Sequence, residues 1–123
     1  MQTFCTIITA DYFPKAVALY KSIRTFNKEI TLQILVSDDK PITTPFPGNE
    51  GLTIITTTAL SEYSLVDSLY KKYAHINFDD FRWSMKPVFA SYLLRSGYDK
   101  IIYMDCDMFF VNDYNFLLDE LND

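Results

Sequence analysis

The segment KIIYMDCDMFF, residues 100–110, places Asp105 and Asp107 one residue apart inside an apolar run. Moving a carboxylate out of water is costly unless something pairs with it. Alternate residues of a strand share one face, about 6.5 Å apart at Cα, so both carboxylates are expected to converge while Cys106 faces the packed side. Mn²⁺ and Mg²⁺ take such oxygen ligands and complete their shell with phosphate and water. We interpret Asp105 and Asp107 as candidate ligands of Mn²⁺ or Mg²⁺.

A second interpretation ends the strand at Met104 and places both aspartates in a solvated turn. Apolar residues resume at once in MFFV, residues 108–111, which is unusual for an exposed turn. This continuation favours the metal interpretation over the turn.

The rest of the chain alternates between strand-like and helix-like segments. Runs rich in β-branched and aromatic residues predict strands at 3–9, 30–37 and 52–57, and the aspartates are expected late in a fourth strand. Apolar spacing predicts helices from Pro14 onward, at 61–73, at 83–96 and at 112–121, with a loop at 41–51. The third of these helices is expected to start near residues 84–86, with Pro87 in its first turn and Gly97 as its stop.

This alternation predicts a single α/β domain over residues 1–123, with a mostly parallel sheet covered by helices on both faces. Ligands of such sheets lie beyond the carboxyl ends of the strands, at a topological switch point. Asp11 follows the first strand, and Asp38 and Asp39 follow the second. Acidic residues therefore gather where a ligand is expected.

Composition narrows the function classes. The chain is 49% hydrophobic and 16% aromatic, as in globular proteins, and its three glycines leave little room for a glycine-rich phosphate loop. A net charge of −5 argues against nucleic acid as a partner. Cys5 and Cys106 read as two buried free thiols, and neither a signal peptide nor a transmembrane segment is apparent, so we expect a cytoplasmic protein.

The sequence GYDKIIYMDCDMFFVND, residues 97–113, resembles the DxD segment of GT-A fold glycosyltransferases, most closely family 8, the glycogenin and lipopolysaccharide galactosyltransferase group. The opening IITADYFPKAVALYKSI, residues 7–23, is similar to the first strand and loop of that family. FRWSMKPVFASYLL, residues 81–94, occupies the place of the helix that carries a basic residue before the DxD strand. The matching order and spacing imply a Rossmann-like GT-A fold.

The resemblance also implies roles for individual residues. Asp105 and Asp107 would bind Mn²⁺ (or Mg²⁺) on the diphosphate of a nucleotide sugar, with Asp105 also near the ribose. Asp11 would lie near the base and Tyr12 would stack on it, and Ala10 completes the nucleotide pocket. Lys86 would pair with the diphosphate, and Arg82 is the rival candidate for that role. Asp38 would lie at the ribose.

The same resemblance implies a hexosyltransferase that moves a sugar from a UDP-sugar donor to a saccharide or other hydroxyl acceptor, with retention at the anomeric carbon. No residue can be named as a nucleophile. Family 8 enzymes are about twice this length or more, and their third metal ligand and acceptor site lie in a C-terminal half. We therefore expect an apparently truncated donor-binding half that binds UDP–Mn²⁺ weakly, transfers little sugar alone and can self-associate through exposed apolar surface.

Three other functions compete with this interpretation. A nucleotidyltransferase of related fold carries a glycine-rich loop after its first strand, where this chain has TADYF, residues 9–13. A HAD-type phosphatase places its DxD motif on the first strand, whereas the DxD of this chain is expected on the fourth. A non-catalytic nucleotide-binding or interaction module stays open. His75, the single histidine, is interpreted as a loop or packing residue, and Trp83 as a core residue.

Overall fold

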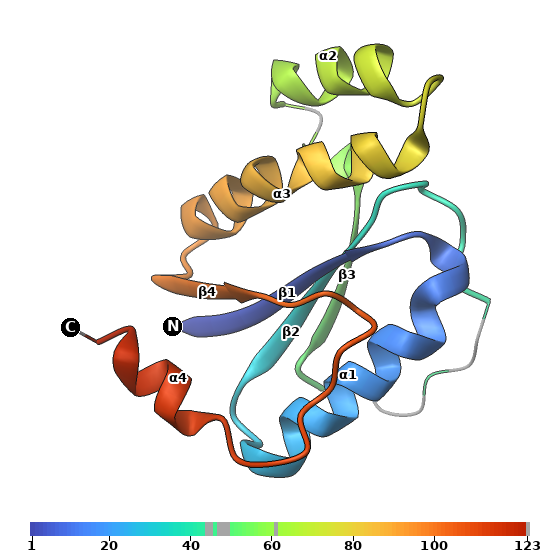
Figure 1. The fold of residues 1–123 in the computed structure, drawn as a ribbon. Coiled ribbons are helices and arrows are strands. Elements are labelled where there is room, and N and C mark those ends of the chain that lie inside the picture. The colour runs from blue at the N-terminus through green and yellow to red at the C-terminus, as the bar shows by residue number, and fades with distance from the viewer. Residues whose placement is uncertain (44–45, 47–49, 61, 123) are drawn as a thin grey trace.

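The computed structural model describes residues 1–122 except 44–45, 47–49 and 61, and the predicted loop at 41–51 therefore lies partly outside the described residues. Its centre is a four-stranded parallel sheet in the order β3-β2-β1-β4 (Figure 1). The strands are β1 (Gln2–Ile8), β2 (Thr31–Val36), β3 (Leu52–Thr56) and β4 (Lys100–Tyr103). The predicted α/β class and parallel sheet are confirmed, and the first three strands lie within a residue of their expected bounds.

The two central strands are buried on both faces. In β1, every residue from Thr3 to Ile8 is buried, and β2 is buried from Leu32 to Val36. Parallel strands covered on both sides read as continuous apolar runs because neither face meets water. The register pairs Phe4 with Leu32 and with Ile102, so β1 lies between β2 and β4 along its length.

Helices cover the two faces of the sheet separately (Figure 1). On one face lies α1 (Phe13–Phe26), which Pro14 opens in its first turn, together with α4 (Asn115–Glu120). On the other lie α2 (Ser64–Tyr73) and α3 (Phe78–Arg95). Two short 3₁₀ helices, Ala10–Tyr12 and Thr57–Leu60, follow β1 and β3. Each face has its own apolar core, one around α1 and one around α3.

Helix α3 begins earlier than the sequence predicts. Asn77 caps it by accepting a hydrogen bond from the Asp79 amide at 3.0 Å, and Pro87 lies in its interior rather than in its first turn. A proline inside a helix leaves the carbonyl four residues earlier, here that of Trp83, without its usual amide donor. The expected start at residues 84–86 was wrong because the cap and the buried Phe81 hold the preceding turns in place.

The segment after β4 also departs from the prediction. Strand β4 ends at Tyr103, so Asp105 and Asp107 lie in a turn in which the Met108 amide donates to the Asp105 carbonyl at 3.1 Å. The turn interpretation was correct on this point, and the prediction that both aspartates lie late in the fourth strand was wrong. The apolar run that follows is not a buried strand either, since Val111 is 83% exposed.

From this turn the chain runs past α1 to α4 (Figure 1). Tyr114 anchors the segment: it is fully buried, and its hydroxyl donates to the Ile23 carbonyl of α1 at 2.7 Å. Its ring also packs edge-on against Phe4 and tilted against Phe110. The path of the chain beyond the aspartates is therefore set by packing against α1.

Several smaller predictions can be compared with the structure. Both cysteines are free, and Cys5 is buried as predicted. Cys106 is only half-buried and lines the same crevice as the aspartates, so its predicted burial on the opposite side was wrong. His75 is exposed in the turn between α2 and α3, as predicted. Trp83 was wrongly assigned to the core, because 51% of it is exposed. Within the described residues, no helix is long and apolar enough to cross a membrane.

Candidate functional site

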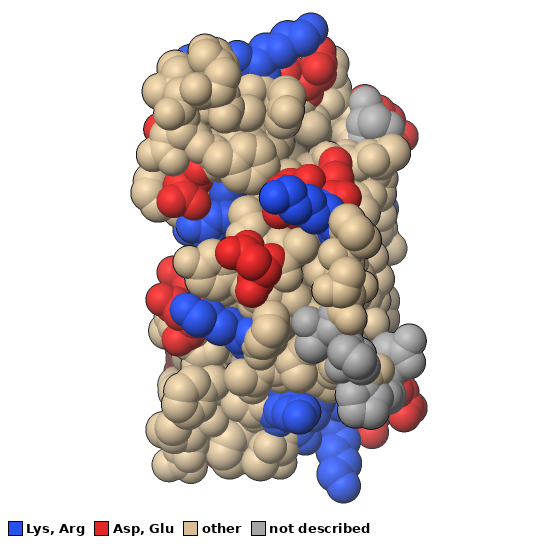
Figure 2. All heavy atoms as spheres, turned by 90° about the vertical axis from the view of Figure 1, so that its right-hand side faces the viewer, with Lys and Arg blue, Asp and Glu red and all other residues tan. Residues whose placement is uncertain are grey.

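The order of the strands defines a switch point beside β1. The chain leaves β1 through α1 to reach β2 on one side, whereas β4 lies on the other side of β1 and is reached through α3 on the opposite face. Connections that diverge in this way leave a crevice between the carboxyl ends of the two strands. Figure 2 shows that edge of the molecule, where acidic and basic side chains intermix near the middle of the view.

A crevice of about 280 Å³ lies at this switch point. Three parts of the chain line it: the end of β1 with the start of α1, the first half of α3, and the aspartate turn after β4. We call it the β1–β4 crevice. Its lining residues are Ile8, Tyr12, Lys15, Asp79, Arg82, Trp83, Asp105, Cys106 and Asp107. The tertiary structure therefore brings together residues separated by up to a hundred positions in sequence.

The two aspartates of the turn offer oxygen donors that suit a hard divalent cation. Both carboxylates are exposed, and both residues line the β1–β4 crevice. In the part of the chain that the structure describes, no group of three or more His, Cys, Asp or Glu residues is placed to hold a metal ion. The donor set thus fits an ion that shares its shell with phosphate and water, and it does not fit a closed protein cage.

One side of α3 faces this crevice. Asp79, Arg82, Trp83 and Lys86 follow the i, i+3, i+4, i+7 spacing that puts side chains on one helical face. Arg82 pairs with Asp79 at 3.3 Å, and this arginine is largely shielded from solvent. The face presents, in order along the helix, a carboxylate, a guanidinium, an indole and an ammonium.

Lys86 lies beside the crevice and contacts the aspartate turn. Its ammonium is 3.8 Å from an Asp105 carboxylate oxygen and 4.6 Å from the centre of the Tyr103 ring. Lys86 is in the middle of α3, and not in the first turn where the predicted start at residues 84–86 would have placed it. Burial, followed by the negative charge of Asp105, raises the pKa of the Tyr103 hydroxyl well above its ordinary value. That hydroxyl is buried and makes no hydrogen bond within the described residues.

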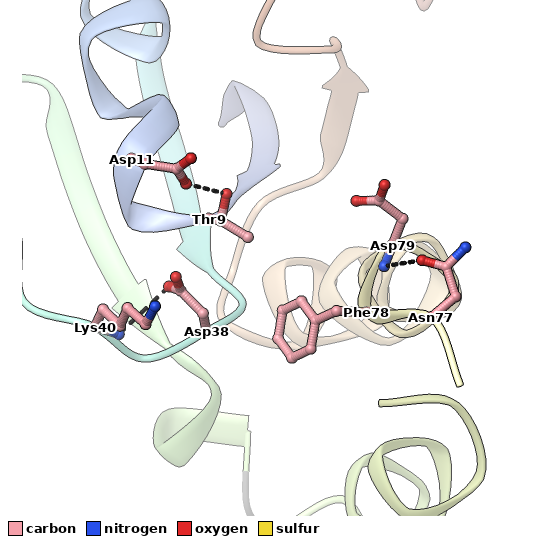
Figure 3. Close-up of a pocket in the computed structure, with 7 residues that line it drawn as sticks. All are labelled: Thr9, Asp11, Asp38, Lys40, Asn77, Phe78 and Asp79. Carbon is pink, nitrogen blue, oxygen red and sulfur yellow. Dashed lines mark hydrogen bonds between the residues drawn. The ribbon is translucent and has the colours of Figure 1, made fainter. Parts of the chain in front are cut away.

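A larger cleft of about 690 Å³ adjoins the crevice, and Asp79 lines both. Residues after β1 and β2 and the start of α3 line this β1–β2 cleft (Figure 3). In Figure 3, Phe78 projects from α3 toward the loop that carries Asp38. The lining residues are Thr9, Asp11, Asp38, Lys40, Asn77, Phe78 and Asp79.

Backbone amides and hydroxyls hold the acidic residues of the β1–β2 cleft. Asp38 accepts from the Ala10 amide, with its two oxygens at 3.2 and 3.3 Å, and this bond ties the loop after β2 to the loop after β1. Asp11 accepts from the Thr9 hydroxyl at 2.5 Å. These bonds give Asp38 a structural role in the loop after β2, and Ala10 contributes through its backbone.

The predicted residues therefore divide between two adjoining hollows. Tyr12, Asp105 and Asp107 line the crevice, whereas Asp11 and Asp38 line the cleft. Tyr12 is 45% exposed, which leaves its ring accessible to a ligand, and the Lys15 ammonium lies 4.8 Å from its centre.

Sequence reasoning missed part of the site. The sequence did not predict that the two hollows would be lined by Lys15, Asn77, Phe78 and Trp83. A helical pattern extended back to Asn77 and Asp79 would have placed Trp83 on the polar face of α3 with Arg82 and Lys86. Reading Pro87 as a helix start concealed that pattern.

Comparisons with known proteins give a limited result. No protein-family model matches the chain. The chain is similar to the uncharacterised protein YfnF of Bacillus subtilis (strain 168), with 26% identity over 113 residues. The match covers 89% of this chain and 36% of that protein, so the chain spans little more than a third of the relative's length. The name of that protein states no activity. Fold and site together define an α/β chain with a parallel sheet and a crevice at the switch point of the sheet.

Proposed function

We propose that this chain is the donor-binding part of a GT-A type glycosyltransferase, related to family 8, which binds a nucleotide sugar through Asp105 and Asp107. The observation that carries the proposal is the joint lining of one crevice by Tyr12, Asp105 and Asp107 at the switch point of a parallel sheet. These residues belong to the two segments whose sequences resemble that family.

The division of the site into two hollows supports a ligand with two chemically different ends. The β1–β4 crevice combines two carboxylates with the cations Lys15 and Arg82, which suits a diphosphate accompanied by a divalent cation. The β1–β2 cleft has about 690 Å³ of space and an aromatic side chain, Phe78, which suits a nucleoside. A nucleotide sugar presents both ends at once.

In the reaction that we propose, the sugar leaves a nucleoside diphosphate for an acceptor hydroxyl. A Mn²⁺ or Mg²⁺ ion held by Asp105 and Asp107 would supply positive charge to the departing diphosphate. Lys86 and Arg82 add positive charge from α3: Arg82 lines the crevice, and the Lys86 ammonium lies 3.8 Å from an Asp105 carboxylate oxygen. In this arrangement Phe78 offers a ring for stacking on the base, and Tyr12 lines the diphosphate end of the site. The acceptor is a saccharide or another hydroxyl compound, and retention at the anomeric carbon belongs to the same proposal.

Titration calorimetry of UDP, with and without Mn²⁺, tests this proposal. We expect Mn²⁺-dependent binding that Asp107→Asn weakens by about tenfold or more, since even indirect partners of a metal ligand are worth that much. Asp119→Asn is the matched control, because Asp119 is an exposed carboxylate on α4 that lines neither hollow. Binding that needs no metal, or that survives Asp107→Asn unchanged, would reject the assigned site.

A binding module without transfer activity is the second candidate. The two-carboxylate donor set serves this candidate equally well, because Asp105 and Asp107 can hold an ion on a bound diphosphate whether or not a sugar is transferred. Both candidates predict the same UDP titration. Release of free hexose or its transfer to an added acceptor, measured with UDP-hexose and Mn²⁺, separates them.

A further inference from the structure

Trp83 is the single tryptophan of the chain, and its position is unusual for so large an apolar side chain. It is 51% exposed, and it lines the β1–β4 crevice rather than the apolar core on its own side of the sheet. A tryptophan contributes most when its large surface is buried, and exposed aromatic rings in a hollow commonly mark a contact with a ligand. Its exposure therefore calls for a partner.

The surroundings of Trp83 indicate what kind of partner fits. Within the same crevice lie Asp105 and Asp107 on the turn after β4, with Arg82 adjacent on α3. An apolar ring face bordered by carboxylates and a guanidinium matches a hexose, which has apolar C–H faces and a rim of hydroxyl groups. The carboxylates accept hydrogen bonds from hydroxyls, and the guanidinium donates to them.

The alternative partner for the indole is the nucleobase, and the arrangement of the two hollows argues against it. The adjoining β1–β2 cleft offers the nucleoside about 690 Å³ of space and the base an aromatic partner, the Phe78 ring. In a nucleotide sugar the hexose is bonded to the diphosphate, whereas the base is separated from the diphosphate by the ribose. Of the two candidate partners for the indole, the hexose therefore lies nearer to the proposed diphosphate and metal ligands than the base does.

From this geometry we infer that Trp83 is a sugar-binding residue, whose indole packs against the hexose of the nucleotide-sugar donor beside Asp105 and Asp107. This inference rests on the proposed function, and it adds a named contact for the sugar. It gives Trp83 a role in distinguishing a sugar nucleotide from the bare nucleotide. UDP alone would leave the indole uncovered, and UDP-hexose would cover it.

Because the chain has one tryptophan, its fluorescence reports this contact directly. The probes are UDP, UDP-glucose, UDP-galactose and UDP-N-acetylglucosamine with Mg²⁺, a diamagnetic ion that does not itself quench the indole. We expect at least one UDP-hexose to shift the emission to shorter wavelength as water leaves the indole. UDP at saturation should produce a clearly smaller shift.

Calorimetry on two variants completes the test. Trp83→Ala should weaken binding of the responding UDP-hexose by roughly three- to tenfold, the size of an aromatic contact, and leave UDP affinity unchanged. Trp83→Phe, which keeps an aromatic ring, should restore most of the loss. Circular dichroism and thermal unfolding of both variants check that α3 stays folded.

The outcomes separate this inference from the proposed function. If the native chain binds UDP with metal but Trp83→Ala weakens UDP and UDP-hexose equally, the indole contacts the nucleotide and the sugar assignment is wrong. If Trp83→Ala changes neither affinity, the residue has no binding role. If the native chain binds neither UDP nor any UDP-hexose, both the proposed function and this inference are rejected.

Discussion

The Lys86 ammonium lies 3.8 Å from a carboxylate oxygen of Asp105, so a residue proposed to bind diphosphate pairs with a residue proposed to bind metal. Both side chains are partly exposed, at 40% and 57%, and the separation is long for an ion pair. Exposed pairs of this kind contribute only about 0–1 kcal/mol to folding. The pair can therefore open at little cost when a ligand takes either partner.

The first prediction concerns the removal of this lysine. Lys86→Met should change the free energy of unfolding by less than about 1 kcal/mol, because the pair is exposed. It should nevertheless weaken binding of UDP with Mg²⁺, because the diphosphate loses a cation. Lys71→Met is the matched control: Lys71 pairs with Asp67 at 2.8 Å on α2, where neither residue lines the crevice. Equal losses of UDP affinity in the two variants would mean that only overall charge matters.

The second prediction concerns Tyr103, whose ring lies beneath the Lys86 ammonium. Its buried hydroxyl has no hydrogen-bond partner within the described residues. Tyr103→Phe keeps the ring and removes an unsatisfied polar group, so it should be neutral or stabilise the fold by up to about 1 kcal/mol in urea unfolding. Tyr103→Leu removes the ring and should weaken UDP binding by releasing Lys86. A destabilising Tyr103→Phe would show that the hydroxyl has a partner after all.

The third prediction concerns the anchor at Tyr114, which holds the chain beyond the aspartate turn against α1. Tyr114→Phe removes the 2.7 Å hydrogen bond to the Ile23 carbonyl and should cost about 1 kcal/mol in chemical denaturation. Tyr114→Ala also empties a buried aromatic site and should cost about 3–5 kcal/mol. If the two variants were equally stable, the contacts with Phe4 and Phe110 would carry little of the packing energy.

The fourth prediction is a loss of stability at high pH. Burial raises the pKa of the Cys5 thiol from 9.0 to about 12, and burial likewise raises the pKa of Tyr114 from 10.0 to about 12. The folded state therefore keeps these protons when the unfolded chain has begun to release them. The stabilisation is complete below the unfolded pKa values, and it declines as pH rises through 9 toward 12.

Urea midpoints measured between about pH 8 and pH 11 test this sign. The urea midpoint of the native chain should fall as pH rises. The midpoint of Cys5→Ala should fall less steeply, because this variant lacks the buried thiol that titrates. Cys106→Ala is the comparison: burial also raises the pKa of the Cys106 thiol, but Cys106 is less buried than Cys5, so its removal should flatten the slope less. A slope that is the same in all three proteins would assign the pH dependence to other groups.

Much of the architecture was readable from local pattern. Continuous apolar runs such as the one from Phe4 to Ile8 are typical of strands buried on both faces, and they predicted the first three strands within a residue. The alternation of strands and helices predicted a parallel sheet because such strands need crossover helices. These features depend on backbone periodicity and on burial. Both can be recognised from the residue types at neighbouring positions in the sequence.

The composition of the site depended on contacts that the sequence does not display. Strand β4 stops at Tyr103 and the aspartates enter a turn, because Tyr114 and Phe110 draw the following chain onto α1, far away in sequence. Trp83 lies at a crevice because α3 starts at Phe78 and turns its polar face toward the ends of β1 and β4. Strand and helix types follow from local residue preferences, whereas the meeting of Tyr12, Trp83 and Asp105 follows from how whole elements pack across the sheet.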